Sequence, residues 1–555
     1  MSDSDSLSFI QPGPELGNEF HDDWMLRAWL ESVLPAETLS AEQPVLAELG
    51  ERAGGEWYRF QQADRLNEPR LTRWTPWGER CDTIELTALW QQAKRWAAEY
   101  GIVATGYDDA LGEYARTVQF ARAWLFIPST DFYGCPLAMT DGAARILSEA
   151  GNDALGERAL PHLLARDGDA FWTSGQWMTE TTGGSDVSGT ETVARQDGDG
   201  QWRLTGRKWF TSAATSEMAL TLARPEGNPD GSRGLALFYV EPHDERARLQ
   251  NIRILRLKDK LGTRKLPTAE LWLDGAPAAP VAGLERGVAA IAPMLNLTRT
   301  WNAVTSCTMM RRGIALATSY ARKRRAFGRA LIDQPLHRQT LAALEADYAA
   351  ASAATLAMVG ELGRVEHDHP DASAELLRLL TPMIKLGTAR KAVAAASETL
   401  ECFGGAGYVE DTGLPLLLRD AQVLAIWEGT TNVLALDLLR ALGAVGIDPW
   451  LVRMRDRLQS VADERLSVVR TIAEGALQRI PDWLEHEPDV LEANARTVAM
   501  NLYRTTALVE LAWLAEQRLA AGDERALAAA MHYAVVRFAT DPVDRRGLGA
   551  ALIGE

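Results

Sequence analysis

The chain has 555 residues, of which 46% are hydrophobic and 24% charged, and its formal net charge at pH 7 is -17. This composition is typical of a folded protein with more than one core, and it argues against a disordered or fibrous chain. The negative charge disfavours long-range attraction to nucleic acid or to an anionic membrane. No apolar run approaches the length of a membrane span and the start shows no secretory leader pattern, so we expect a cytoplasmic protein without membrane contact.

Helical periodicity dominates the first part of the chain. In "TALWQQAKRWAAEYG" and "GEYARTVQFARAWLF", apolar residues recur at spacings of three and four. They predict an N-terminal helical domain over residues 1–170. Short runs such as "QWRLTGRKWF", "MALTLAR", "GLALFYVE" and "TAELWLDG" follow, bounded by Gly, Asp, Asn and Pro, and predict a β domain over 171–282.

Long helical segments return after the β domain. "NAVTSCTMMRRGIALATSYARKRRAFG" and "SAELLRLLTPMIKLGTARKAVAAASETLECFGG" have lengths that suit an antiparallel bundle, predicted over 283–442. A further helical extension is predicted over 443–555, with a break at "HEPD". The order of helices, then strands, then helices lacks the alternation of a doubly wound sheet. The predicted fold class is therefore α+β, mainly α, without a dinucleotide-binding Rossmann domain.

The cysteines and histidines do not predict a metal site. The four cysteines are widely scattered and form no C-x-x-C pair. His367 and His369 lie two positions apart in a predicted loop, where no third ligand is evident.

Two glycine-rich stretches and one acidic residue are the candidate functional features. "TETTGGSDVSGT" and "ECFGGAGYVED" are either turns or places where the backbone approaches a flat or anionic ligand. Neither opens a helix within a βαβ unit. Glu428 lies in "LAIWEGTTNVLALDLLRAL", whose other residues are mostly apolar, small or hydroxyl-bearing. Apolar surroundings raise the pKa of a carboxyl group, so Glu428 is either a solvated helix-terminal acid or a tuned base.

Five motifs resemble, in order and spacing, those of the acyl-CoA dehydrogenase superfamily: "MTETTGGSDV", "GRKWFTS", "YARKRRAFG", "ECFGGAGYVED" and "LLRDAQVLAIWEGTTN". The N-terminal "PELGN", the segment "RLKDKLGTRK" and the extension after Leu442 further resemble the AidB-type, alkylation-response branch. The resemblance implies the fold of that superfamily, in which the β domain covers the flavin, and it implies FAD as the cofactor.

The resemblance also implies a role for Glu428. It occupies the position of the general base, which removes an α-proton from an acyl-CoA thioester while the flavin accepts a hydride from the β-carbon. In the family, the backbone N–H of this residue and a ribityl hydroxyl bind the thioester oxygen. Some relatives place the base on a bundle helix, where this chain has Leu297 and Thr298, so Glu428 is the only candidate base. Arg299 is expected to cap the pocket or to support the bundle.

The flavin contacts implied by the resemblance come from several segments. The residues at the isoalloxazine and substrate side are Gln176, Met178, Thr179, Gly184, Ser185, Phe210 and Ser212. Those that meet the pyrophosphate and adenine, in part across a subunit interface, are Arg324, Phe327, Glu401, Gly404, Gly405, Thr430 and Asn432. The chain departs from the family at Phe210, Ser212 and Glu401, where Trp, Thr and Gln are usual. Contacts across an interface imply a homotetramer, or at least a dimer.

Three functions are considered, of which the first is the predicted one and the other two are alternatives. The first is α,β-dehydrogenation of an acyl-CoA, with electron-transfer flavoprotein as a possible electron acceptor. The second is a flavoprotein of the AidB type that binds DNA through its C-terminal part, and the third is a fatty-acyl binding protein with little turnover. From position 441 onwards the chain has 13 arginines, no lysine and 17 acidic residues, which is not the footprint of a non-specific DNA binder. Arg453, Arg455 and Arg457 could still form a small basic patch.

Overall fold

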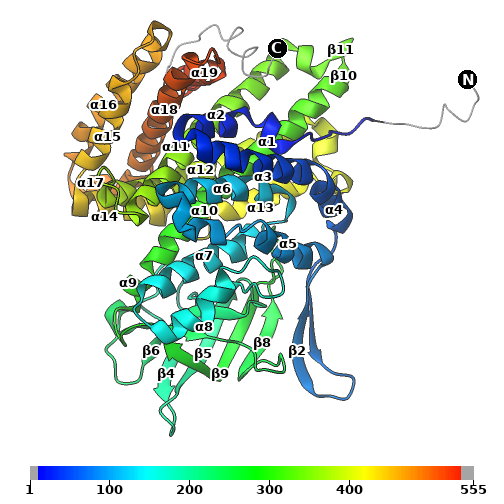
Figure 1. Cartoon of the computed structure of the whole chain (residues 1–555), viewed down its shortest axis with the longest axis vertical. Helices are drawn as coiled ribbons and strands as arrows, with labels where there is room; N and C mark the ends of the chain where they lie inside the picture. Colours follow the sequence, from blue (N-terminus) through cyan, green and yellow to red (C-terminus); the bar gives the residue numbers. More distant parts are fainter. Residues whose placement is uncertain (1–10, 539–555) are drawn as a thin grey trace, which may run out of the picture.

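The computed structural model of the chain describes residues 11–538. Helices make up most of the molecule, and a β-sheet lies at one end of it (Figure 1). The predicted fold class, α+β and mainly α, is confirmed. The helices share one continuous apolar core, while the strands enclose a second core of their own that includes Trp177, Leu204 and Phe238.

The N-terminal helices begin where the sequence provides capping side chains. Asp23, Thr87 and Asn152 each accept a hydrogen bond from the backbone N–H three residues further on, which satisfies a free donor of the first helical turn. The helices of this part are α1 (Glu19–Asp22), α2 (Trp24–Val33), α3 (Ala36–Gly54), α4 (Glu56–Asp64), α5 (Ala88–Glu99), α6 (Ala115–Phe126), α7 (Gly134–Glu149) and α8 (Asp153–Leu163).

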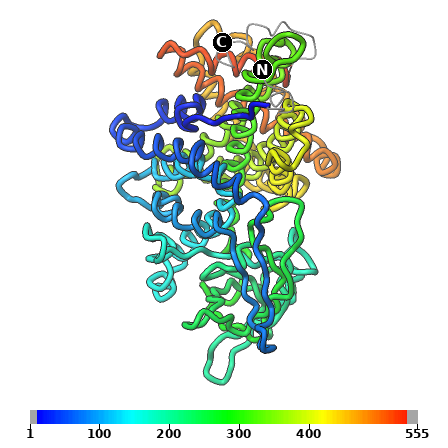
Figure 2. The backbone as a smooth tube through the Cα atoms, turned by 90° about the vertical axis from the view of Figure 1, so that its right-hand side faces the viewer, coloured from blue at the N-terminus to red at the C-terminus, as the bar shows by residue number. Residues whose placement is uncertain are grey.

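A β-hairpin interrupts these helices, where the sequence was expected to be mostly helical. Its strands, β1 (Arg70–Trp74) and β2 (Arg80–Glu85), pair antiparallel and run beside the sheet (Figure 2). The hairpin covers an edge of that sheet, because the Arg80 guanidinium donates to the Ile254 carbonyl at 3.1 Å and the Ile254 N–H donates to Asp82 at 2.9 Å. These contacts satisfy backbone groups that an open edge would leave free. The helical prediction was therefore wrong for this segment.

The sheet has seven strands, five of which close into a ring. The path runs β6, β4, β5, β9, β7 and back to β6, while β3 extends it beside β6 and β8 beside β9. Most pairs are antiparallel, but β6 lies parallel to β3 and β4. The strands are β3 (Ser174–Trp177), β4 (Val193–Gln196), β5 (Trp202–Thr211), β6 (Met218–Pro225), β7 (Ala236–Val240), β8 (Ile252–Leu257) and β9 (Ala269–Pro280).

Three long helices form the centre of the bundle, and α12 packs against both α10 and α11. A short hairpin, β10 (Arg325–Ala326) with β11 (Arg329–Ala330), follows α10 at the end of the molecule opposite the sheet (Figure 1). Thr430 caps α14 at its N-terminus. The helices are α9 (Gly287–Ala290), α10 (Ala292–Lys323), α11 (Pro335–Glu366), α12 (Ala374–Cys402), α13 (Pro415–Leu424) and α14 (Thr431–Val445).

The last helices pack on the outside of this bundle (Figure 1). The longest, α18, lies against α11, α12 and α14. The predicted break at "HEPD" lies where α16 ends and α17 begins, since α17 starts at Pro488. The helices are α15 (Asp448–Gln459), α16 (Ser467–Leu484), α17 (Pro488–Ala493), α18 (Ala495–Leu519) and α19 (Arg525–Phe538). Within residues 11–538, no helix has both the length and the hydropathy needed to cross a membrane.

Candidate active site

Glu428 lies in the tight connection between α13 and α14. Its φ is 54° and that of Gly429 is 104°, so two consecutive residues have left-handed backbone conformations. A side chain on such a residue costs free energy, about 1–2 kcal/mol, and the conformation persists only where neighbouring contacts hold it. The turn therefore presents Glu428 in a conformation that the surrounding helices must stabilise.

The Glu428 carboxylate is partly buried and hydrogen-bonded. The Thr298 hydroxyl, from α10, donates to Glu428 Oε2 at 2.7 Å. Loss of hydration raises the pKa of Glu428, while the Thr298 hydrogen bond and the charges of Arg299 and Lys385 oppose that rise. A carboxylate whose pKa is raised in this way is suited to act as a general base.

Two cations from the bundle lie beneath the turn. The Lys385 ammonium, from α12, donates to the carbonyls of Trp427 and Gly429 at 2.7 Å each. Arg299 Nε donates to the Glu428 carbonyl at 3.3 Å. The stretch around Glu428 also contains a second acid, Asp437, which pairs with Arg299 at 2.9 Å. Arg299 thus supports the bundle and the turn together.

The predicted isoalloxazine contacts lie on the sheet. Gln176 belongs to β3, Phe210 belongs to β5, and the exposed residues Gly184 and Ser185 lie in the loop after β3. The Gln176 Oε1 atom is buried, and no group within residues 11–538 donates a hydrogen bond to it. Phe210 is 43% exposed. These features are those expected of a surface that receives a flat polar ligand.

A buried ion pair fixes the loop that follows β3. Lys208 Nζ lies 2.7 Å from Glu180 Oε1, and both side chains are almost fully buried. The Trp209 N–H also donates to the Thr179 carbonyl at 2.9 Å, which ties the loop to β5. Met178 and Thr179 are therefore held next to the strand that carries Phe210.

A chain of contacts connects the sheet with the Glu428 turn. The Ser212 and Thr268 hydroxyls lie 3.4 Å apart, and Lys260 Nζ donates to Thr268 Oγ1 at 3.0 Å. Cys135, at the start of α7, lies close enough to Lys260 and Glu428 for both charges to affect the pKa of its thiol. Burial is the largest influence and raises that pKa to about 12, so the thiol stays protonated. Lys260, which contacts Thr268 on the sheet side, and Glu428 are thus both near Cys135.

Of the remaining predicted contacts, Thr430 and Asn432 follow Glu428 at the start of α14, whereas the others lie far from this turn. Arg324 is the C-cap of α10, and Phe327, which is 96% exposed, forms the turn of the β10–β11 hairpin. Glu401, Gly404 and Gly405 are exposed at the end of α12. At about 1.5 Å per residue, the part of α10 between Thr298 and Arg324 spans about 39 Å. Within one chain, Arg324 is therefore far from the Thr298 hydroxyl that contacts Glu428.

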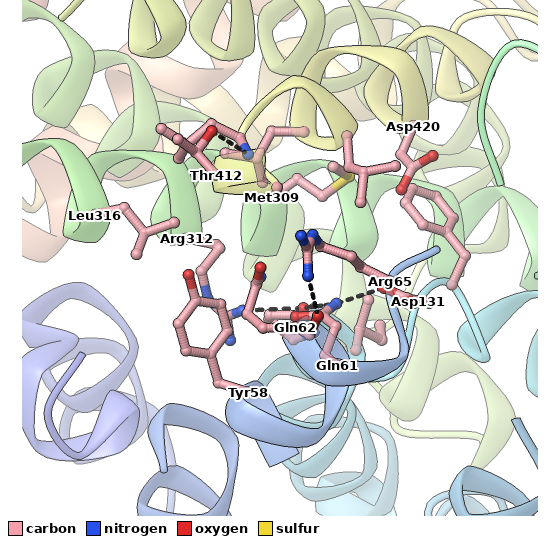
Figure 3. A pocket seen from close by; sticks show the side chains of 17 residues that line it. Tyr58, Gln61, Gln62, Arg65, Asp131, Met309, Arg312, Leu316, Thr412 and Asp420 are labelled. Atoms are coloured by element: carbon pink, nitrogen blue, oxygen red, sulfur yellow. Dashed lines mark hydrogen bonds between the residues drawn. The ribbon is translucent and has the colours of Figure 1, made fainter. Parts of the chain in front are cut away.

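A narrow cavity lies along α10, on the way from the Glu428 turn to this distant set. Figure 3 shows Tyr58, Gln61 and Arg65 at one side of it and Met309 and Leu316, from α10, at another. Phe132 lines the same cavity and packs against Trp427, with 6.1 Å between the ring centroids. For the residues that the structure covers, no group of three or more His, Cys, Asp or Glu side chains could hold a metal ion.

Sequence reasoning missed Lys385 and undervalued Thr298. Lys385 is fully buried, and the signal was a basic residue among the apolar and small neighbours of "PMIKLGT". Thr298 was noted only for lacking a carboxylate, whereas its hydroxyl is the direct partner of the Glu428 side chain.

Comparison with known proteins identifies the class to which this fold and site belong. Family models match the AidB N-terminal domain over residues 12–170, the acyl-CoA dehydrogenase middle domain over 175–276 and the acyl-CoA dehydrogenase C-terminal domain over 285–443. The chain therefore belongs to the acyl-CoA dehydrogenase family, which confirms the predicted family and enzyme class. Its N-terminal domain and the relatives below place it in the AidB-type branch.

Two curated relatives support this placement. The chain is 41% identical to acyl-CoA dehydrogenase family member 11 of Caenorhabditis elegans, over 89% of this chain and 84% of that protein. It is 32% identical to the putative acyl-CoA dehydrogenase AidB of Escherichia coli, over 72% of this chain and 73% of that protein.

Solved structures agree with this result. The structure of Caenorhabditis elegans ACDH-11 in complex with C11-CoA superimposes with a TM-score of 0.93 at 39% identity, covering 98% of this chain and 95% of that one. The apo-form of Bd2924 superimposes with a TM-score of 0.86 at 45% identity, covering 92% of this chain and 100% of that one.

Proposed function

We propose that the protein is a FAD-dependent acyl-CoA dehydrogenase that oxidises the α,β bond of an acyl-CoA thioester, with Glu428 as the general base. The observation that carries this proposal is the Glu428 carboxylate itself, which is partly buried, has a raised pKa and is oriented by Thr298. The family membership and the C11-CoA complex of the ACDH-11 relative support an acyl-CoA as the ligand.

The residues on the sheet fit a flavin. The buried, unpartnered Gln176 Oε1 can accept a hydrogen bond from a ring N–H, and the half-exposed Phe210 ring provides an apolar surface. Gly184 and Ser185 leave the nearby loop open to a flat ligand. The bound flavin would supply the acceptor for the hydride that leaves the β-carbon. Electron-transfer flavoprotein is the proposed next electron carrier.

The chain's own residues would handle the proton and the developing negative charge. Glu428 takes the α-proton, and Thr298 keeps the carboxylate in one orientation. Among residues 11–538, no group accepts a hydrogen bond from the Glu428 N–H, so this donor is free to stabilise the thioester oxygen as the α-proton leaves. Both actions need the same substrate position, which a single rigid turn can define.

We further propose that the flavin site is completed by a second subunit. Arg324, Phe327, Glu401, Gly404 and Gly405 lie at the end of the molecule opposite the sheet. There, exposed cationic and glycine-rich backbone groups suit a pyrophosphate and an adenine. Thr430 and Asn432, at the N-terminus of α14, would lie beside the nucleotide. This arrangement requires a dimer at least, and a homotetramer is the proposed assembly.

The test is anaerobic mixing of the flavin-loaded protein with acyl-CoAs of increasing chain length. Bleaching of the flavin absorbance by at least one acyl-CoA is expected, since dehydrogenation reduces the flavin. A protein that takes up no FAD, or that binds acyl-CoA without bleaching, would contradict the proposal. The second outcome would favour the role of a fatty-acyl binding protein.

DNA binding through the C-terminal extension has less support from the residue geometry. Arg453 and Arg457 point towards the buried Glu510, at 3.2 Å and 3.0 Å, and only Arg455 lies exposed on the opposite face of α15. The three arginines therefore do not form one patch. A duplex-DNA mobility shift that weakens with added salt would favour the DNA-binding reading instead.

A further inference from the structure

Lys385 is a buried cation for which no carboxylate partner lies within ion-pair distance among residues 11–538. It lies in the middle of α12, its side chain is fully buried, and within residues 11–538 its two hydrogen bonds go to backbone carbonyls of the Glu428 turn. Burying an ammonium without a paired acid is costly, and its loss of hydration lowers the pKa of Lys385 to about 7. The free-energy cost of burying Lys385 suggests that this side chain has a function.

Lys385 and Arg299 together donate hydrogen bonds to three successive backbone carbonyls. Lys385 holds the carbonyls of Trp427 and Gly429, and Arg299 holds that of Glu428 between them. Hydrogen bonds from charged donors are stronger than those between neutral groups. Glu428 and Gly429 lie outside any helix or strand, so no regular backbone hydrogen bonding stabilises their left-handed conformations. The hydrogen bonds from Lys385 and Arg299 can balance the free-energy cost of these conformations.

The direction of these carbonyls sets the direction of the catalytic groups. In a trans peptide the C=O and the following N–H point in opposite directions. When the Trp427 carbonyl points at Lys385, the Glu428 N–H must point away from α12. This is the N–H that has no partner within the described residues and that the proposed reaction needs for the thioester oxygen.

We infer that Lys385 is a positioning residue for the base: by holding the carbonyls of Trp427 and Gly429, it aims the carboxylate and the backbone N–H of Glu428 at the substrate. This role rests on the proposed function of Glu428. The charge of Lys385 also contributes, because burial favours the protonated form of the Glu428 carboxyl group and a positive Lys385 opposes this effect. The other charged or titratable groups facing this region are Arg299, Cys135 and Asp437.

The test compares Lys385→Met with Lys391→Met. Lys391 lies on the same helix, less than two turns further on, is mostly buried and pairs with Asp347 at 3.1 Å. Asp347 keeps Arg537 as a second partner, so this control removes a similar side chain without touching the Glu428 turn.

The first measurement is hydrogen–deuterium exchange of the peptide that contains residues 425–432, in protein without substrate. Lys385→Met is expected to speed its exchange at least about tenfold, since two charge-assisted hydrogen bonds are lost, whereas Lys391→Met leaves it unchanged. Equal exchange in both variants would overturn the inference. If Lys385→Met fails to fold, Lys385→Gln replaces it, because the amide keeps one donor without the charge.

The second measurement is the pH profile of flavin reduction. Without the Lys385 charge the pKa of Glu428 rises, so the acidic limb of the profile moves to higher pH in Lys385→Met and stays in place in Lys391→Met. In a Glu428→Gln background, Lys385→Met should cause little further loss, because both changes act through the same group. If the acidic limb of the Lys385→Met profile stays where it is in the wild type, the proposed effect of the Lys385 charge on Glu428 is wrong. If the wild type reduces no flavin, the proposed function fails, and the exchange experiment still decides whether Lys385 holds the turn.

Discussion

Replacing Lys208 by Met should strongly destabilise the sheet that carries the predicted flavin contacts. Its ammonium lies 2.7 Å from Glu180 Oε1 and 2.8 Å from the Leu222 carbonyl, and its side chain has no exposed surface. Glu180 also accepts hydrogen bonds from the Glu191 N–H and the Thr192 hydroxyl. The variant keeps the buried carboxylate but removes its counter-charge, and breaking such a pair costs about 3–5 kcal/mol.

Urea unfolding followed by tryptophan fluorescence measures this effect, because Trp177, Trp202 and Trp209 all lie in strands of the same sheet. With a slope of about 1–3 kcal/mol per molar urea, the midpoint should fall by at least about 1 M. The double variant Glu180→Gln with Lys208→Met should recover part of the loss, because no unpaired charge remains while the amide still accepts from the Glu191 N–H.

Added salt should change this difference little, since screening acts weakly on buried charges. A Lys208→Met midpoint within experimental error of the wild type would refute the reasoning, because it would mean that the carboxylate is not isolated from water. A double variant less stable than Lys208→Met alone would show that the acid, rather than the pair, stabilises the loop.

Three further predictions concern titration, the C-terminal extension and the shared site. Burial raises the pKa of Asp420 to about 7, above its unfolded value, so the folded protein binds more protons between about pH 4 and 7. The free energy of unfolding of the wild type relative to Asp420→Asn should therefore fall as the pH rises through that window, and a pH-independent difference would contradict this. Glu510→Gln leaves the partly buried Arg457, whose guanidinium lies 3.7 Å from the centre of the Trp513 ring, without a carboxylate partner among residues 11–538, whereas Arg453 keeps Glu361 at 3.8 Å. A loss of about 1–3 kcal/mol is expected in thermal or urea unfolding, and no loss would mean that the Arg457–Glu510 pair is solvated. When Glu428→Gln and Arg324→Ala subunits are mixed in equal amounts and reassociate, about half of the dimers contain one of each, and one of the two sites in such a dimer is intact. The mixture should therefore show roughly a quarter of the wild-type activity. If each site is built within one chain, mixing should restore no activity.

The sequence allowed the fold class to be predicted because each part of it carries a clear periodicity. The short apolar runs "MALTLAR" and "GLALFYVE" form β6 and β7, which are buried almost throughout. The β1–β2 hairpin was not predicted because its faces are mostly exposed, so no apolar alternation marks it. Its hydrogen bonds to the sheet involve Ile254, which lies far away in the sequence. Long-range side-chain contacts of this kind have no local signature.

The candidate site was predictable in identity but not in arrangement. Glu428 could be recognised from its motif, and the prediction that it acts as the base stays a prediction. That Arg324 lies about 39 Å along α10 from Thr298 follows only from the continuity of one helix. The contact of Lys385 with the Glu428 turn joins a residue of α12 to the connection between α13 and α14, and the sequence offers no spacing rule for such a contact. The division of the chain into four domains likewise stays a prediction.

The most direct test of the account is the rate of anaerobic flavin reduction by an acyl-CoA in the wild type and in Glu428→Gln. The amide keeps the size of the side chain but cannot accept the α-proton. Both proteins should bind FAD and acyl-CoA alike, while the variant should reduce its flavin more slowly by a factor on the order of 10²–10⁴. Equal rates of reduction in the two proteins, with matched FAD content, would contradict the assignment of Glu428 as the base.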